Sequence, residues 1–302
     1  MTDKALGVNY FNDGNFPLSV RRVDRRQNIS HQDDLTEIEH FHDFTEIVFI
    51  IKGKGVQIIE EKEYPVSAGD VFVLQGNQKH YFKEAKAIEI VNVMYSTKRH
   101  KSLLSDEIKK LEGYKALFIL ESQYRALHYF KNKLHLVRSD MAKLEIVLNS
   151  MIVEQTNKLE GHELILKNRL EELIVLLSRY YSRLDATEAK ALVRIGKIID
   201  FLEQNFADKI YLDQLSEMAF MSTRNFQRIF KKAVGSSPTN YLMQIRLQKA
   251  RKLLRESELP VSEIAMEAGF GDGNYFIKCF KKENAITPIK FRMRYGNRKT
   301  GL

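Results

Sequence analysis

Residues 226–232 have the sequence Phe-Gln-Arg-Ile-Phe-Lys-Lys, and residues 276–282 have the sequence Phe-Ile-Lys-Cys-Phe-Lys-Lys. A Ser-Pro pair at 237–238 follows the first stretch and a Thr-Pro pair at 287–288 follows the second, each leading to an aromatic residue. Apolar residues spaced three and four apart predict a helix, a short turn and a second helix in both copies. The end of the chain is therefore predicted to be all-α, with two helix-turn-helix units.

The two copies also match at the turn between their helices. In the first unit Phe220 and Met221 form the turn, and Ser222 is placed to cap the helix that follows. In the second unit Gly269-Phe270-Gly271 form the turn and Asp272 takes the cap position. The second turn is one residue longer, which a loop tolerates.

Phenylalanines are expected to form the buried face of the second helix in each unit, together with Ile277 in the second unit. Polar residues then point outward. They suit a major groove, because Arg and Lys bind guanine acceptors, Asn and Gln pair with adenine, and further cations bind phosphate. A solvated surface side chain is the alternative for each. The predicted DNA-contact residues are Thr223, Arg224, Asn225, Gln227, Arg228 and Lys231 in the first unit and Gly273, Asn274, Tyr275, Lys278 and Lys281 in the second.

A long helix is predicted between the units, from Ser237-Pro238 to about Glu256. Because it fixes both units, their second helices should enter successive major grooves, about 34 Å apart. Residues 191–302 contain 20 Lys and Arg against 11 Asp and Glu, whereas the first 190 residues contain 28 of each. Such a basic segment is typical of nucleic-acid binding, although a solvated basic surface without a partner has the same composition.

The run from Ile264 to Lys282, continued by Thr287-Pro288 and Phe291-Arg292, resembles the signature of the AraC/XylS family of bacterial transcription regulators. Ala285 departs from the family pattern, which has glycine there, so a less sharply turned helix end is expected. The resemblance implies a regulator that binds double-stranded DNA as a homodimer and contacts RNA polymerase if it is an activator. It also implies base contacts by Arg224, Gln227 and Arg228 in the first unit and by Asn274 and Lys278 in the second.

Residues 1–120 have a different pattern. Short β-rich runs at 46–51, 56–60, 70–74 and 88–94 are separated by turn signals. This rhythm predicts a small antiparallel barrel or sandwich, and a barrel of this size can hold one small ligand. The whole chain is therefore expected to be α+β, with an N-terminal effector-binding barrel and a C-terminal all-α domain.

His40, His42 and Glu46, followed by His80 after Gly69-Asp70, resemble the two sequence motifs of the cupin barrels. Three imidazoles and one carboxylate form a set that could bind a divalent transition metal. The set alternatively consists of polar barrel residues that satisfy one another by hydrogen bonds.

Two departures alter the second cupin motif: Gln75 stands where the motif has proline, and Glu84 where it has asparagine. Members of the regulator family commonly keep a His-x3-Glu pattern, here His42 and Glu46, and a later histidine, here His80, without using metal. We therefore expect no cofactor, and the alternative is a metal site formed by His40, His42, Glu46 and His80.

Short matches at 42–48, 80–82, 92–95 and 117–121 look most like the rhamnose-regulator branch of the family. The resemblance implies a small effector, a sugar such as rhamnose, bound in the barrel. A monosaccharide needs convergent donors and acceptors beside a flat apolar wall. The aromatic segment from Tyr10 to Phe16 is a candidate lid. The predicted effector-contact residues are Arg21, Arg22, His42, Glu46 and His80.

Residues 121–186 are predicted to be helical. A polar stretch at 185–190 is the expected linker to the DNA-binding domain, residues 191–302. Two interpretations stay open for an apolar seam in the helical segment: packing within the chain, or a two-fold dimer contact. The seam consists of Leu166, Leu170, Leu173, Leu177, Tyr180 and Leu184.

The single cysteine, Cys279, excludes an intramolecular disulfide and is expected to be a small core residue. The first residues lack the apolar segment of a signal peptide, and no apolar run is long enough to cross a bilayer. We therefore expect a cytoplasmic protein with no membrane partner.

Two other functions stay open on the sequence. One is a metal-dependent cupin enzyme fused to a DNA-binding tail, and the other is an architectural protein that binds DNA without base preference. The sequence contains no phosphate-cradling glycine loop, nucleophile elbow or zinc-finger spacing. We therefore predict a regulator and not an enzyme.

Overall fold

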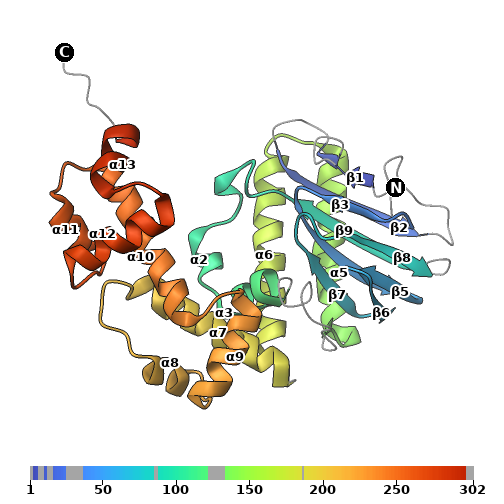
Figure 1. Ribbon diagram of the computed structural model, residues 1–302. Coiled ribbons are helices and arrows are strands. Elements are labelled where there is room, and N and C mark those ends of the chain that lie inside the picture. Colours follow the sequence, from blue (N-terminus) through green and yellow to red (C-terminus); the bar gives the residue numbers. More distant parts are fainter. Residues whose placement is uncertain are drawn as a thin grey trace. The chain divides into compact units, whose positions relative to one another are not determined.

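The computed structural model describes residues 3–5, 10–11, 16–24, 37–84, 88–121, 133–185 and 187–296 (Figure 1). The chain forms two compact units, Met1–Gly196 and Lys197–Leu302, which we call unit 1 and unit 2. Their boundary falls inside one helix, α7 (Thr187–Gln204). The segment expected as a linker is therefore helical from Thr187 on.

Unit 1 contains two five-stranded sheets, and its strands are antiparallel except for the parallel pair β1 and β3. One sheet has the order β1 (Asp3–Ala5), β3 (His40–His42), β8 (His80–Glu84), β5 (Lys54–Ile59), β6 (Lys62–Ser67). The other has the order β10 (Leu134–His135), β7 (Asp70–Leu74), β4 (Thr45–Lys52), β9 (Glu89–Tyr95), β2 (Leu18–Asp24).

The four β-rich runs predicted from the sequence correspond to β4, β5, β7 and β9. Their alternate side chains form one buried core with residues from both sheets, including Val48, Ile59, Phe72 and Phe82. Because side chains alternate along a strand, residues two apart on these strands face the same interior. Glu46 therefore shares a face with Val48.

Helices follow the barrel in unit 1. They are η1 (Lys101–Leu103), α2 (Asp106–Lys109), α3 (Glu112–Tyr114), the π-helix η2 (Lys115–Glu121), α5 (Arg138–Asn157) and α6 (His162–Ser182). The predicted helical segment also holds a short strand, β10, which pairs with β7. Residues 122–132 lie outside the described ranges.

The leucine seam of α6 is buried within the chain. Leu166, Leu170, Leu173 and Leu177 are all buried, and α6 packs against α5 and α3. Tyr181 takes the next buried position, whereas Tyr180 is only half-buried. The four leucines thus serve intrachain packing.

Helix α5 also covers one sheet edge. Gln155 accepts a hydrogen bond from the Val20 backbone N–H at 2.7 Å and donates one to the Val20 carbonyl at 3.1 Å. Its amide thereby satisfies polar groups that edge strand β2 would otherwise leave unpaired.

Unit 2 is all-α, as predicted. The first helix-turn-helix unit consists of α8 (Leu212–Met218) and α9 (Thr223–Val234), and the second of α11 (Val261–Glu267) and α12 (Gly273–Asn284). The long helix α10 (Pro238–Glu256) joins them, and α13 (Pro288–Tyr295) follows. None of the helices in the described ranges is long and apolar enough to span a bilayer.

Side-chain caps set the register of α9 and α12. Ser222 accepts a hydrogen bond from the Asn225 backbone N–H, and Asp272 accepts one from the Tyr275 backbone N–H. Both caps were predicted. At the other end, Gly235 and Ala285 have φ of 79° and 61°. Ala285 thus adopts the left-handed conformation that favours glycine, and the expectation of a less sharp turn was wrong.

Candidate functional site

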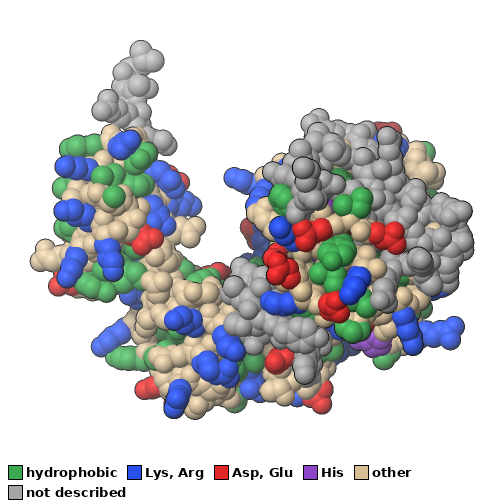
Figure 2. Space-filling model, turned by 45° about the vertical axis from the view of Figure 1, so that its right-hand side comes forward, with side chains coloured by type: hydrophobic (Ala, Val, Ile, Leu, Met, Phe, Trp, Pro, Cys, Tyr) green, Lys and Arg blue, Asp and Glu red, His purple; other side chains and the backbone are tan. Residues whose placement is uncertain are grey.

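Nine of the eleven DNA-contact residues predicted on α9 and α12 are exposed on the outer faces of these helices. Phe226, Phe230, Phe276 and Phe280 are completely buried, which fixes the opposite face toward solvent. Figure 2 shows many Lys and Arg side chains on the visible surface of unit 2. The exposed members of the predicted set are Arg224, Gln227, Arg228, Lys231, Gly273, Asn274, Tyr275, Lys278 and Lys281.

Two members of the set are engaged inside the first unit. The Thr223 hydroxyl donates to Asp213 Oδ1 at 3.0 Å and lies 3.1 Å from the Ser216 hydroxyl, so it ties α9 to α8. Asn225 Oδ1 accepts a hydrogen bond from the Arg228 guanidinium at 2.8 Å. Both residues are half-buried.

Ile277 was expected to be buried, and this was wrong: the side chain is 40% exposed. The duplication explains its position. Phe276 repeats Phe226, so Ile277 repeats Gln227, which is also exposed. The apolar side chain of Ile277 predicted a buried position, whereas the alignment of the two repeats places the residue on the exposed face of the helix.

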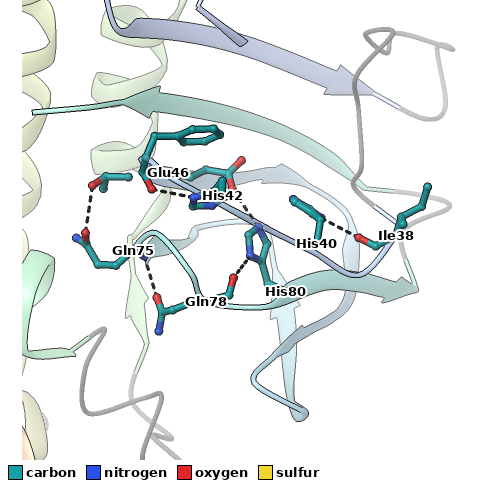
Figure 3. Close-up of polar contacts among 9 residues, drawn as sticks. Ile38, His40, His42, Glu46, Gln75, Gln78 and His80 are labelled. Carbon is teal, nitrogen blue, oxygen red and sulfur yellow. Dashed lines mark hydrogen bonds and ion pairs between the residues drawn. The ribbon is translucent and has the colours of Figure 1, made fainter. Parts of the chain in front are cut away.

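The predicted polar cluster does form inside the barrel (Figure 3). Glu46 Oε2 lies 3.1 Å from His80 Nε2 and 3.3 Å from His42 Nε2. His40 joins them, since the ring centroids of His40 and His80 are 4.3 Å apart. All four side chains are buried, and β3, β4 and β8 supply them.

Backbone carbonyls fix the orientation of all three imidazoles. The Nδ1 atom of His40 lies 2.7 Å from the Ile38 oxygen, that of His42 2.8 Å from the Phe44 oxygen, and that of His80 2.9 Å from the Gln78 oxygen. A carbonyl only accepts, so each Nδ1 is the donor. In their neutral tautomers the Nε2 atoms of His40 and His42 then carry a lone pair, whereas the hydrogen bond between His80 Nε2 and the Glu46 carboxylate, 3.1 Å long, needs a proton on that nitrogen.

Burial sets the charge states of the cluster. Burial and the neighbouring His80 lower the pKa of His40 to about 4. Burial also lowers the pKa of His42. Burial raises the pKa of Glu46, but the nearby His42 and the hydrogen bond from His80 outweigh it, so the pKa lies below its ordinary value. At neutral pH the site therefore holds the Glu46 carboxylate beside the neutral imidazoles of His40 and His42.

The residues fit a divalent transition metal. One ligand atom from each of His40, Glu46 and His80 lies within 4.8 Å of the others. His42 Nε2 is buried and has no hydrogen-bond partner among the described residues, and it lies 3.3 Å from an oxygen of the Glu46 carboxylate. Nitrogen and carboxylate donors with carbonyl-bound Nδ1 atoms are the ligand set and supporting contacts that such ions prefer.

The two predicted effector-contact arginines lie differently. Arg21 is stacked over the Tyr10 ring at 4.6 Å, and Tyr10 packs with Phe11, Phe44 and Met94. Residues 12–15 of the candidate lid lie outside the described ranges. Arg22 does not reach the cluster. Its guanidinium pairs with Glu89 and donates to Asn149 Oδ1 on α5 at 2.7 Å, because successive strand residues point to opposite faces.

Two family models match the chain: a helix-turn-helix domain at residues 215–294 and a cupin domain at residues 31–94. A relative from Citrobacter koseri, the HTH-type transcriptional activator RhaS, is 30% identical over 258 residues, which cover 84% of this chain and 87% of that protein. The chain belongs to the AraC/XylS family of transcription regulators. RhaS from Klebsiella pneumoniae is 29% identical, with the same coverage.

Among solved structures, the chain is similar to the C-terminal domain of the response regulator yesN from Fusobacterium nucleatum. The two are 40% identical, with a TM-score of 0.31, over 32% of this chain and 94% of that domain. As a member of the AraC/XylS family, the protein is a regulator that binds double-stranded DNA through its helix-turn-helix domain.

Proposed function

We propose that this regulator activates transcription by reading its operator with the exposed faces of α9 and α12. The observation that supports the proposal is repeated in the two helix-turn-helix units: on α9 and on α12, completely buried phenylalanines hold one face of the helix and a polar face opposite them is exposed. Similar proteins are transcriptional activators by name, and activation requires contact with RNA polymerase. Arg and Lys on these faces bind guanine and phosphate, and Gln and Asn bind adenine.

Competition between an upstream promoter fragment and random duplex at fixed salt tests base reading. Arg228→Ala and Lys278→Ala should each cost about 1–3 kcal/mol of discrimination. Lys252→Ala on α10 removes the same charge away from the reading faces and should retain discrimination. If both reader variants fold and discriminate like the wild type, the proposal is wrong.

The proposed effector is a sugar such as rhamnose, bound at the barrel cluster. Its contacts would be Arg21, His42, Glu46 and His80, without Arg22. Polar atoms inside the barrel support this site: His42 Nε2 and both amide atoms of Gln57 are buried, and none makes a hydrogen bond within the described chain. A hydroxyl-rich ligand would satisfy such groups, whose burial without partners is costly.

Thermal shift against a monosaccharide panel that includes L-rhamnose tests the effector site, since a ligand of the native state raises the melting temperature. Glu46→Gln should abolish the shift, because it replaces the central acceptor. Glu61→Gln, at an exposed turn of the same barrel, should retain it. A shift that survives Glu46→Gln would place the sugar elsewhere.

The proposal includes a homodimer formed through the helices of unit 1. Large apolar side chains remain exposed there, among them Ile146 and Val153 on α5 and Leu164 on α6. Their exposure favours a protein contact. Sedimentation should show that Ile146→Glu shifts the protein toward monomer, whereas Ile38→Glu, an exposed apolar residue next to the barrel, does not. An unchanged dimer in Ile146→Glu would refute this face.

Divalent metal binding is a second candidate function of the same cluster. It is favoured by the convergence of the Nε2 atoms of His42 and His80 on the Glu46 carboxylate. A bound cation would supply charge that neutralises Glu46 and orients a ligand, and we propose no catalytic role. Zn²⁺ titration should give one ion per chain, with affinity lowered at least about tenfold in His80→Gln. His135→Gln, outside the cluster, should bind normally, and loss in both variants alike would refute the site.

A further inference from the structure

Gln75 lies between the barrel cluster and the helical part of unit 1. Its side-chain Oε1 accepts a hydrogen bond from the Thr45 hydroxyl at 3.1 Å, and its Nε2 donates to the Phe118 carbonyl at 2.6 Å. Thr45 is the neighbour of Glu46 on β4, and Phe118 lies in the π-helix η2. The side-chain amide thus joins the start of β4 to η2, and its bond to Phe118 spans 43 residues of sequence.

The loop from β7 to β8 connects Gln75 to the histidines (Figure 3). The Gln75 backbone N–H donates to Gln78 Oε1 at 2.8 Å, and the Gln78 carbonyl accepts from His80 Nδ1 at 2.9 Å. The Asn77 backbone N–H donates to the His42 carbonyl at 2.8 Å. Both histidines that contact Glu46 are therefore bonded to the loop that positions Gln75.

Helix η2 is in turn packed against the helix that leads out of unit 1. A Cβ on Gly196 of α7 would lie 3.3 Å from the Glu112 carbonyl and 3.5 Å from Lys115 Cβ. On the other side, a Cβ on Gly113 would lie 2.0 Å from the Ser178 carbonyl of α6. Because α3 and η2 are packed this tightly, a displacement of η2 must move its neighbours.

We propose that Gln75 is a positioning residue that couples occupancy of the barrel cluster to η2, and through η2 to α7. A ligand that rearranges His42, Glu46 or His80 changes the β7–β8 loop, and the Gln75 amide transmits the change to the Phe118 carbonyl. α7 runs from unit 1 into unit 2, so its first turns are the element on which this coupling acts. The inference rests on the proposed effector site.

The role also accounts for a departure in the sequence. The cupin motif has proline at position 75, and proline has neither the amide side chain nor the backbone N–H that make these bonds. A glutamine here gains three hydrogen bonds that connect strand, loop and helix. Coupling between sites is demonstrated only when perturbing one site changes the other through the residue in question.

The test is a double-mutant cycle read by hydrogen exchange in the full-length chain. Four proteins are compared: wild type, Glu46→Gln, Gln75→Ala and the double variant. Exchange is measured at amides of residues 115–121 and 191–196. We expect Glu46→Gln to change exchange there at least about fivefold when Gln75 is present, and less than about twofold in the Gln75→Ala background.

Gln155→Ala provides the matched control, because Gln155 also makes two hydrogen bonds between the barrel and a helix but lies away from the cluster. The effect of Glu46→Gln on exchange should persist in its background. Equal effects with and without Gln75, or no effect of Glu46→Gln in either, would overturn the proposal. The cycle needs no sugar, so a negative thermal shift with monosaccharides would refute the effector separately.

Discussion

The imidazole rings of His40 and His80 lie 4.3 Å apart, centroid to centroid, inside the barrel. Burial and the charge that His80 can carry together lower the pKa of His40 to about 4, from an ordinary value of 6.5. Between these two values the unfolded chain binds a proton at His40 and the folded chain does not. Stability must therefore fall as the pH is lowered through this window.

We predict that the lowered pKa of His40 by itself reduces the free energy of unfolding by about 2 kcal/mol when the pH falls from 6.5 to 5. Urea denaturation at several pH values checks this, with the difference between wild type and His40→Gln as the measured quantity. The depressed pKa of Glu46 adds no slope in this range, since its contribution is lost only below its unfolded value of 4.5. A constant difference between the two proteins would contradict the prediction.

The ends of α9 and α12 allow a reciprocal test of backbone strain. Ala285 has φ of 61°, and Gly235 holds the equivalent position with φ of 79°. Ala285→Gly should raise the unfolding free energy by about 1 kcal/mol, because glycine adopts the left-handed region without steric cost. Gly235→Ala should lower it by a similar amount, since a Cβ there meets nothing within 4 Å and only strain remains.

The turns before α9 and α12 contain two equivalent positions at which substitution should have unequal effects on stability. Phe220 and Gly269 occupy equivalent positions with φ of 52° and 82°. Phe220 is 79% exposed, so Phe220→Gly should stabilise the chain by about 1 kcal/mol. A Cβ on Gly269 would lie 2.7 Å from Ala207 Cα and 2.7 Å from the Phe206 carbonyl. Gly269→Ala should therefore cost about 2–4 kcal/mol in denaturation, from strain and overpacking together. Equal and small effects at both positions would show that the contact with 206–207 is not rigid.

The duplication allowed unit 2 to be predicted in detail, because each copy constrains the other. Ser222 and Asp272 were expected as caps and act as caps. The strands β4, β5, β7 and β9 followed from apolar runs between turn signals. These features depend on local sequence, where a cap or an alternation is visible within a few residues.

Two of the features that were not predicted are contacts between residues far apart in the sequence, which no local pattern encodes. Arg21 and Arg22 are adjacent and chemically identical, and only the strand register decides that Arg22 contacts Glu89 and Asn149 while Arg21 stacks over Tyr10. The altered motif residue Gln75 was visible in the sequence, but its partner Phe118 is remote. Ile277 was assigned to the core by its side chain, although comparison with Gln227 places it outside.

Ile277 lies on the exposed face of α12 and offers the reading helix an apolar side chain. In the major groove the apolar feature of a base pair is the C5-methyl group of thymine. We therefore predict that Ile277 contacts one thymine in the part of the operator that α12 binds. This base pair corresponds to the one that Gln227 contacts in the part that α9 binds. Gln227 should select adenine by a bidentate hydrogen bond instead.

Replacing single thymines of the operator by uracil removes only the methyl group, and binding titrations at fixed salt measure the loss. One such replacement should weaken binding of the wild type by about 1 kcal/mol. It should not change the affinity of Ile277→Ala, because that variant already lacks the contact with the methyl group. Gln227→Ala serves as the control: it should lose discrimination at an adenine but keep the sensitivity to uracil. If every uracil replacement weakens binding of Ile277→Ala as much as it weakens binding of the wild type, the side chain lies outside the groove and α12 selects bases through its polar residues alone.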